Sequence, residues 1–168
     1  MSAVPNLKVK LFADGADLAG IKEMAANPAI RGFTTNPTLM RKAGVADYKA
    51  FALQALQVVG GRPISFEVFA DEFGEMEKQA HEIASWGKNI YVKIPVTNTA
   101  REFSGPLVER LSRAGVQVNV TALMTVDQVK RVTERLAPDT PAIISVFAGR
   151  IADTGRDPMP IMAEAVRV

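Results

Sequence analysis

Lys93 is the residue of this sequence with the clearest chemical potential, because it lies near the end of an apolar stretch that is predicted to form a strand. Successive side chains of a strand point to opposite faces, so Tyr91 and Lys93 share one face while Val92 and Ile94 share the other. Burial disfavours the cationic form of an amine, and a neutral lysine can attack a carbonyl carbon to form an imine. A lysine at the end of an isolated strand more often keeps its ammonium group in solvent. The rest of the chain therefore has to decide between these two interpretations.

Segments with strand and helix patterns alternate along the chain from Lys8 onward. The predicted strands are 8–13, 32–35, 63–69, the stretch through Lys93 that Pro95 ends, 116–121 and 141–147. The predicted helices are 17–26, 38–40, 46–59, 72–86, 100–114, 126–136 and 158–168. This alternation predicts an α/β fold with a parallel sheet covered by helices, either an open doubly wound sheet or a closed barrel.

The distribution of polar residues within the strands favours the barrel. No glycine-rich phosphate loop follows the first strand, which argues against a nucleotide-binding open sheet. Polar residues recur near the C-terminal ends of the six predicted strands, at Asp14, Asn36, Glu67, Lys93, Asn119 and Ser145. Helix capping would explain Asp14 and Asn36 but not the whole set. Because (β/α)8 barrels build their active sites at this end of the strands, the sequence predicts a site there.

The composition is that of an ordinary globular protein with one domain. The chain has 168 residues, of which 48% are hydrophobic and 23% charged, and a net charge of +2 without a basic run that would indicate nucleic-acid binding. The absence of cysteine excludes disulfides and thiol catalysis, and a single histidine, His81, argues against a multi-histidine metal site. Met1–Lys10 lacks the apolar core of a secretory signal, and no apolar run approaches membrane-spanning length. We therefore expect a cytoplasmic protein.

Six stretches of the sequence, in chain order, match one family: 11–14, 32–38, 66–68, 92–95, 118–121 and 144–151. Together they resemble the transaldolase family, close to its small bacterial members that include fructose-6-phosphate aldolase-like enzymes. The resemblance implies a TIM-type (β/α)8 barrel and class I aldol chemistry without cofactor or metal. The implied reaction, part of the pentose phosphate pathway, transfers a dihydroxyacetone unit between sugar phosphates such as sedoheptulose 7-phosphate or fructose 6-phosphate and aldose phosphates.

The same resemblance implies four catalytic residues. Lys93 resembles the lysine that forms the Schiff base, and Asp14 resembles the residue that takes the proton from the substrate hydroxyl beside the bond being cleaved. Glu67 and Thr121 resemble the pair that holds a catalytic water, through which protons move during imine formation and hydrolysis.

Four further residues are implied to bind substrate. Asn36 and Asn119 resemble hydrogen-bond partners of the sugar hydroxyls. Ser145 and Arg150 resemble the phosphate-binding end, where a guanidinium can grip the dianion with two parallel hydrogen bonds.

Two questions stay open at the level of sequence. In the family, a glutamate at the position of Glu67 and a phenylalanine at the position of Phe147 are associated with transfer, so transaldolase is favoured over a direct fructose-6-phosphate-type aldolase. About six β/α units are present, and eight would need roughly fifty more residues. We therefore expect residues 1–168 to form a single barrel domain that is incomplete at its C-terminus. The chain is expected to form a homo-oligomer, and a catalytically inactive truncated barrel is the alternative to an active enzyme.

Overall fold

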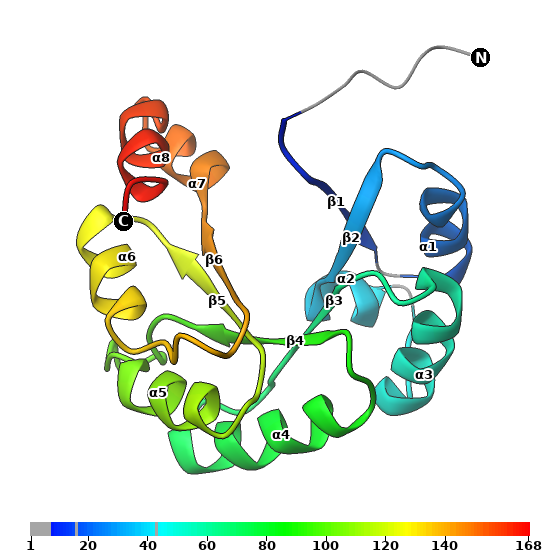
Figure 1. The fold of residues 1–168 in the computed structure, drawn as a ribbon. Coiled ribbons are helices and arrows are strands. Elements are labelled where there is room, and N and C mark those ends of the chain that lie inside the picture. The colour runs from blue at the N-terminus through cyan, green and yellow to red at the C-terminus, as the bar shows by residue number, and fades with distance from the viewer. Residues whose placement is uncertain (1–7, 16, 43) are drawn as a thin grey trace. The chain divides into compact units, whose positions relative to one another are not determined.

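Residues 8–15, 17–42 and 44–168 are described by a computed structural model (Figure 1). Residues 1–7, which form most of the stretch examined above for a signal sequence, lie outside the described residues, as do 16 and 43. The chain divides into two compact units. The first comprises 1–67 and 82–91, and the second comprises 68–81 and 92–168.

Six strands form a sheet in the order β1-β2-β3-β4-β5-β6. Their bounds are Leu11–Gly15, Ile30–Thr35, Ile64–Glu67, Ile90–Pro95, Val118–Leu123 and Ala142–Val146. In the first unit β1 pairs with β2 and β2 with β3, and in the second β4 pairs with β5 and β5 with β6, all in parallel. Strand order that follows chain order is the pattern expected of successive β/α units in a TIM-type barrel.

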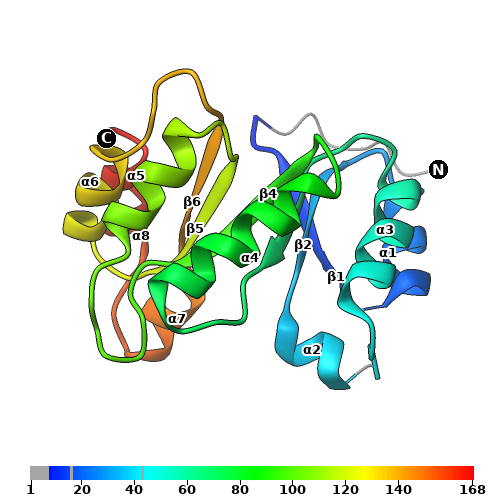
Figure 2. The ribbon, with the colours of Figure 1, turned by 90° about the horizontal axis from the view of Figure 1, so that it is seen from below.

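The first unit carries helices α1 (Leu18–Ala25), α2 (Pro37–Lys42) and α3 (Tyr48–Val59). Helix α1 lies beside α3 (Figure 2). The carboxylates of Asp17 and Asp47 cap α1 and α3 by accepting from backbone N–H groups in their first turns. The core of this unit is formed by apolar side chains that include Phe33, Ala52, Ile64 and Phe66.

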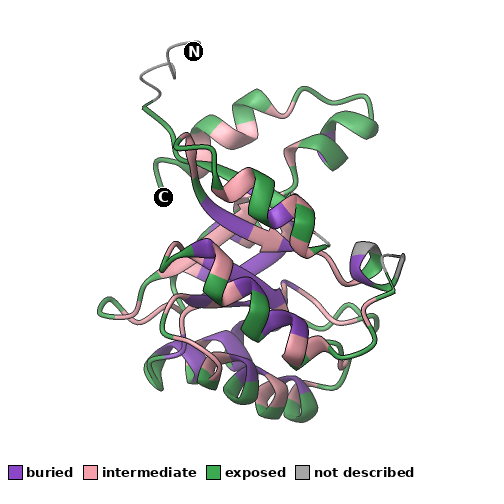
Figure 3. Cartoon of the chain, turned by 90° about the vertical axis from the view of Figure 1, so that its right-hand side faces the viewer, coloured by how far each residue is buried: buried purple, intermediate pink, exposed green. Residues whose placement is uncertain are grey.

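The second unit carries helices α5 (Gly105–Arg113), α6 (Val126–Thr133), α7 (Ala148–Asp153) and α8 (Met159–Ala165), and α4 (Phe73–Ser85) begins in it. Helix α6 lies beside both α5 and α8 (Figure 2). Apolar side chains recur at helical spacing along α5, where Leu107, Val108 and Leu111 are fully buried. Buried residues lie on β5, α5 and α6, whereas every described residue of β6 is half-buried and α8 has no buried residue (Figure 3).

The predicted elements are present, but several of their bounds differ from expectation and one helix was not predicted. The first strand begins at Leu11 rather than Lys8. The predicted helix 100–114 begins only at Gly105, because residues 97–104 form a tight loop closed by an antiparallel bridge between Thr97 and Phe103. The fifth strand is Val118–Leu123 rather than 116–121, and helix α7 was not predicted. Among the residues described, none belongs to a helix that is long and apolar enough to cross a membrane.

Candidate active site

Lys93 lies on β4 in register with Asn119 of β5. Strand β4 alternates buried and half-buried residues, with Val92 and Ile94 fully buried and Lys93 on the other face. Asn119, at 1% exposure, places its amide beside β6, where the Ser145 hydroxyl donates to Asn119 Oδ1 at 2.7 Å. The predicted lysine, amide and hydroxyl thus come from three neighbouring strands of one unit.

Thr121 lies two residues beyond Asn119 and is paired in register with Pro95. Its side chain is 3% exposed, and its Oγ1 has no hydrogen-bond partner among the described residues. The next residue, Ala122, has a left-handed backbone with φ of 64°, and the pairing of β5 with β6 is irregular between Val120 and Leu123. This bulge changes the course of the strand directly after Thr121, and bulges of this kind are common beside active sites.

Asp14 lies on β1 of the first unit in register with Thr34 of β2. The Thr34 hydroxyl donates to Asp14 Oδ1 at 2.8 Å, which orients this exposed carboxylate. Asn36 lies two residues further on, and its Oδ1 accepts from the Thr38 N–H at 2.8 Å. Asn36 therefore caps α2, and the structure brings Thr34, rather than Asn36, to the level of Asp14.

Glu67 is the last residue of β3 and is half-buried. Its backbone N–H donates to the hydroxyl of Tyr48 at 2.8 Å, and that hydroxyl donates to the Glu67 carbonyl at 3.0 Å. Burial raises the pKa of the Tyr48 phenol well above its ordinary value, so this group stays protonated. Tyr48 and Thr34 were both missed by sequence reasoning, and only the position of Tyr48 in the first turn of a predicted helix could have drawn attention to it.

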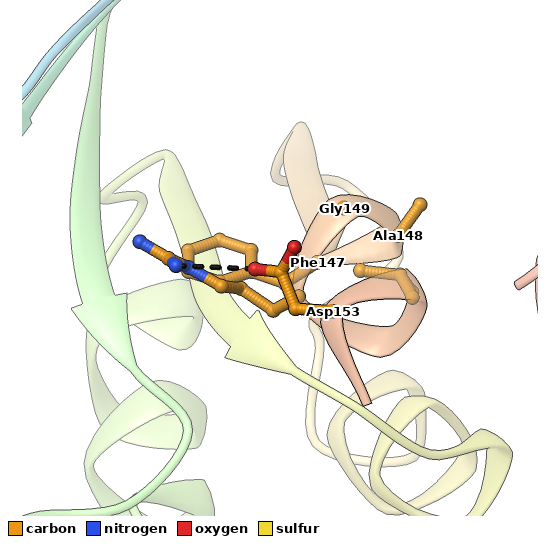
Figure 4. A pocket seen from close by; sticks show the side chains of 6 residues that line it. Phe147, Ala148, Gly149 and Asp153 are labelled. Atoms are coloured by element: carbon orange, nitrogen blue, oxygen red, sulfur yellow. Dashed lines mark hydrogen bonds and ion pairs between the residues drawn. The ribbon is translucent and has the colours of Figure 1, made fainter. Parts of the chain in front are cut away.

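Arg150 lies on α7 and lines an open hollow of about 540 Å³ in the second unit (Figure 4). The hollow is also lined by Phe147, Gly149 and Asp153. Arg150 Nη1 is 3.2 Å from Asp153 Oδ2, and both side chains are exposed. Because an exposed ion pair of this kind is weak, an anion can compete with Asp153 for the guanidinium.

The side chains described above include the functional groups that carbonyl chemistry uses. The second unit holds together an amine, an amide and two hydroxyls, and the first unit holds two carboxylates whose strand ends are fixed by Thr34 and Tyr48. The amine of the second unit suits carbonyl chemistry through an imine, and the carboxylates of the first unit can carry protons. Within 8–15, 17–42 and 44–168, no group of three or more histidine, aspartate or glutamate side chains is placed to hold a metal ion.

Comparisons with known proteins show similarity to one family. Residues 11–168 match the family described as Transaldolase/Fructose-6-phosphate aldolase. A probable transaldolase of Dehalococcoides mccartyi is 36% identical over 160 residues, which cover 95% of this chain and 70% of that protein. A probable transaldolase of Streptococcus agalactiae is 37% identical over 149 residues, which cover 89% of this chain and 65% of that protein.

The fold is similar to the crystal structure of a dihydrodipicolinate synthase, a TIM barrel, with a TM-score of 0.50 and 11% identity. The similarity covers 95% of this chain and 79% of that one. At this level of identity the likeness concerns the fold alone, and it agrees with six β/α units of a (β/α)8-type barrel. The family match and the identities to the two probable transaldolases go further, and they show that the chain belongs to the transaldolase/fructose-6-phosphate aldolase family.

Proposed function

We propose that this protein is a class I transaldolase that transfers a dihydroxyacetone unit between sugar phosphates through a Schiff base on Lys93. The observation that supports this most directly is the arrangement on β4, β5 and β6. Lys93 is in register with Asn119, Asn119 accepts from Ser145, and the buried hydroxyl of Thr121 follows two residues later. An amine beside groups that can bind sugar hydroxyls and a water is what imine chemistry requires.

In the proposed reaction the Lys93 amine attacks the ketone carbon C2 of a ketose phosphate, and loss of water gives a protonated imine. Asp14 takes the proton from the C4 hydroxyl, the bond between C3 and C4 breaks, and its electron pair moves into the imine to form an enamine. The shortened aldose leaves. The enamine carbon then attacks the aldehyde carbon of an acceptor aldose phosphate, and Asp14 returns its proton to the new hydroxyl.

Glu67 and Thr121 are proposed to hold the water that carries protons when the imine forms and is hydrolysed. The Thr121 hydroxyl supports this role, because it is buried and has no hydrogen-bond partner in the described part of the chain. A buried hydroxyl without a protein partner is commonly satisfied by an ordered water.

Substrate contacts are proposed for Asn36, Asn119, Ser145 and Arg150. The exposed Arg150 guanidinium, paired with Asp153, is suited to the phosphate of the sugar, and Ser145 to a neighbouring oxygen. The Asn36 side chain is held at the start of α2, where its Oδ1 accepts from the Thr38 N–H, and a sugar hydroxyl is proposed to contact this amide. A homo-oligomer is also part of the proposal.

The test is borohydride trapping with fructose 6-phosphate followed by peptide mass mapping. Reduction of the intermediate should leave a three-carbon adduct on Lys93 and on no other lysine. The matched control is Lys93→Arg, which keeps a positive charge of similar reach but cannot form the imine. Absence of an adduct in the unsubstituted chain, under conditions where it remains folded, would reject the imine mechanism.

A direct fructose-6-phosphate aldolase is the second candidate, because the family that matches residues 11–168 includes this activity in its description. The two differ in what leaves the enzyme without an acceptor. A direct aldolase releases free dihydroxyacetone, whereas a transaldolase keeps the three-carbon unit on Lys93 until an acceptor aldose arrives. A product assay with and without glyceraldehyde 3-phosphate distinguishes them, and no turnover or adduct in either assay would indicate a catalytically inactive chain.

A further inference from the structure

Tyr48, the first residue of α3, forms hydrogen bonds through its side chain to the backbone of Glu67 at the end of β3. Its hydroxyl oxygen accepts from the Glu67 N–H at 2.8 Å and its hydroxyl hydrogen goes to the Glu67 carbonyl at 3.0 Å. A phenol has one donor and can accept as well, so this one side chain satisfies both backbone groups of Glu67. The bond joins residues 19 positions apart in sequence within the first unit.

The need for this contact arises because β2 ends before β3 does in their shared register. The pairing of β2 with β3 joins Phe33 to Ile64 and Thr34 to Ser65, and β2 ends at Thr35. Pro37, which has no N–H, then starts α2 and carries the chain away from β3. Glu67 therefore lies beyond the last paired residue of β2.

The backbone groups of Glu67 point toward the edge where β2 has ended. Successive N–H groups of a strand point to opposite edges, and the Ile64 N–H bonds to the Asn89 carbonyl on the side of β4. Glu67, three residues after Ile64, therefore points its N–H toward β2. The Tyr48 hydroxyl occupies the place of the missing strand and supplies the acceptor and donor that β2 no longer provides.

Tyr48 is itself held firmly. Its ring makes edge-to-face contacts with Phe66 and Trp86, with centroid distances of 5.9 and 5.6 Å. Its hydroxyl also hydrogen bonds with the side chain of Thr35, which is fully buried. The Asp47 carboxylate caps the start of α3 by accepting from the Ala50 N–H at 2.9 Å. A ring fixed on these sides can transmit a defined position to the end of β3.

We propose that Tyr48 is a positioning residue for Glu67: by binding both backbone groups of Glu67, it fixes the direction in which the carboxylate leaves the strand end. This inference rests on the proposed function, which assigns Glu67 to the catalytic water. Tyr48 touches no reacting atom in this scheme. It acts on imine formation and hydrolysis only through Glu67.

The variant Tyr48→Phe tests this role, because it keeps the aromatic packing and removes the hydroxyl. The matched control is Trp86→Phe, which disturbs the same three-ring cluster but makes no bond to Glu67. We expect Tyr48→Phe to lower kcat about 10-fold with KM nearly unchanged, since an imprecisely held proton carrier slows the chemical steps. Trp86→Phe should leave kcat within about twofold of the unsubstituted protein.

A double-substitution cycle with Glu67→Gln separates positioning from general loosening of the fold. If Tyr48 acts through Glu67, then Tyr48→Phe lowers kcat in the native background and adds little in the Glu67→Gln background. Hydrogen exchange gives an independent reading: the Glu67 amide should exchange about 10-fold faster in Tyr48→Phe and at its native rate in Trp86→Phe.

The outcomes distinguish failure of the positioning role of Tyr48 from failure of the proposed Schiff-base function of Lys93. A Lys93 adduct in the unsubstituted protein, combined with an equal loss of kcat in both backgrounds or an unchanged Glu67 exchange rate, overturns the positioning role of Tyr48 alone. Failure to trap any adduct on Lys93 overturns the proposed function, and the assignment of Tyr48 to catalysis falls with it.

Discussion

Each of the two units contains one buried polar side-chain atom that has no hydrogen-bond partner among the described residues. In the first unit it is Nε1 of Trp86, and in the second it is Oγ1 of Thr121. Buried groups of this kind are uncommon, because desolvation without a compensating bond costs about 1–3 kcal/mol. The two atoms carry the same physical cost in different surroundings.

The surroundings indicate different origins for that cost. The Trp86 ring packs edge-to-face against Tyr48 and Phe66. This favourable aromatic packing explains why the Trp86 N–H is buried without a hydrogen-bond partner among the described residues. Thr121 follows Asn119 on a strand whose neighbour carries Lys93, and it precedes a residue in a left-handed conformation. Packing explains the first unpaired atom, whereas strain beside the second is typical of a functional position. The comparison can be tested by removing each atom in turn.

Thr121→Val should have the largest effect on activity. Valine has nearly the same shape as threonine, so the substitution removes the hydroxyl and little else. Because that hydroxyl makes no hydrogen bond to any residue that the structure describes, we expect the free energy of unfolding to stay unchanged or to rise by about 1 kcal/mol. Transfer activity should fall about 100-fold through loss of the catalytic water. Urea unfolding and steady-state kinetics measure the two quantities, and a loss of stability with normal activity would give Thr121 a structural role.

Ala122→Val tests whether the bulge aims Thr121. A left-handed backbone is unfavourable for any residue with a Cβ atom and worse for a β-branched one, so we expect a loss of about 2 kcal/mol in unfolding free energy. Activity should fall as well, because the strand has to relax at Thr121. Ala122→Gly is the control, since glycine accepts a φ of 64° without strain and should preserve activity. Equal activity in the valine and glycine variants would show that the backbone conformation at Ala122 does not position Thr121 for the reaction.

The order of the strands and helices was predictable from sequence because periodicity reports burial. Strand β4 was predicted closely, since Ile90, Val92 and Ile94 alternate with half-buried residues. The start of α5 was misplaced because the loop before it is ordered by non-helical contacts. There the Asn98 Oδ1 accepts from the Glu102 N–H, and Arg101 adopts a φ of 66°. Such contacts depend on local three-dimensional geometry that periodicity does not encode.

The candidate site was predictable in kind but not in arrangement. Asp14, Glu67, Lys93 and Thr121 were selected by residue type, strand position and resemblance to the family, and their roles remain predictions. The partner of Asp14 is Thr34, which sequence position alone did not single out, because the register of β1 against β2 decides which residue lies opposite. Tyr48 lies on a helix and reaches Glu67 only because β2 ends early. Register and strand length arise from packing of the whole unit.

Trp86→Phe tests whether the unpaired Trp86 N–H of the first unit results from packing alone. The smaller ring loses some packing, while removal of the unpaired N–H recovers part of that loss, so the net change in unfolding free energy should stay below about 1 kcal/mol. Transfer activity should not change. A large loss of activity, measured under conditions where the variant is fully folded, would mean that the unpaired atoms of both units serve the reaction.

Tyr48 supplies the opposite case, a buried polar group with partners, and its contribution to stability should change with pH only at high pH. Burial raises the pKa of this phenol above the value of about 10 that it has in an unfolded chain. The unfolded state therefore loses its proton first as the pH rises, and the stability that Tyr48 contributes is fully present below about pH 10 and is lost progressively above it. The difference in unfolding free energy between the native protein and Tyr48→Phe should accordingly narrow from pH 9 to pH 11. Urea unfolding across this range measures the difference, and a gap that stays constant or widens would show that the Tyr48 hydroxyl is not buried in the folded protein.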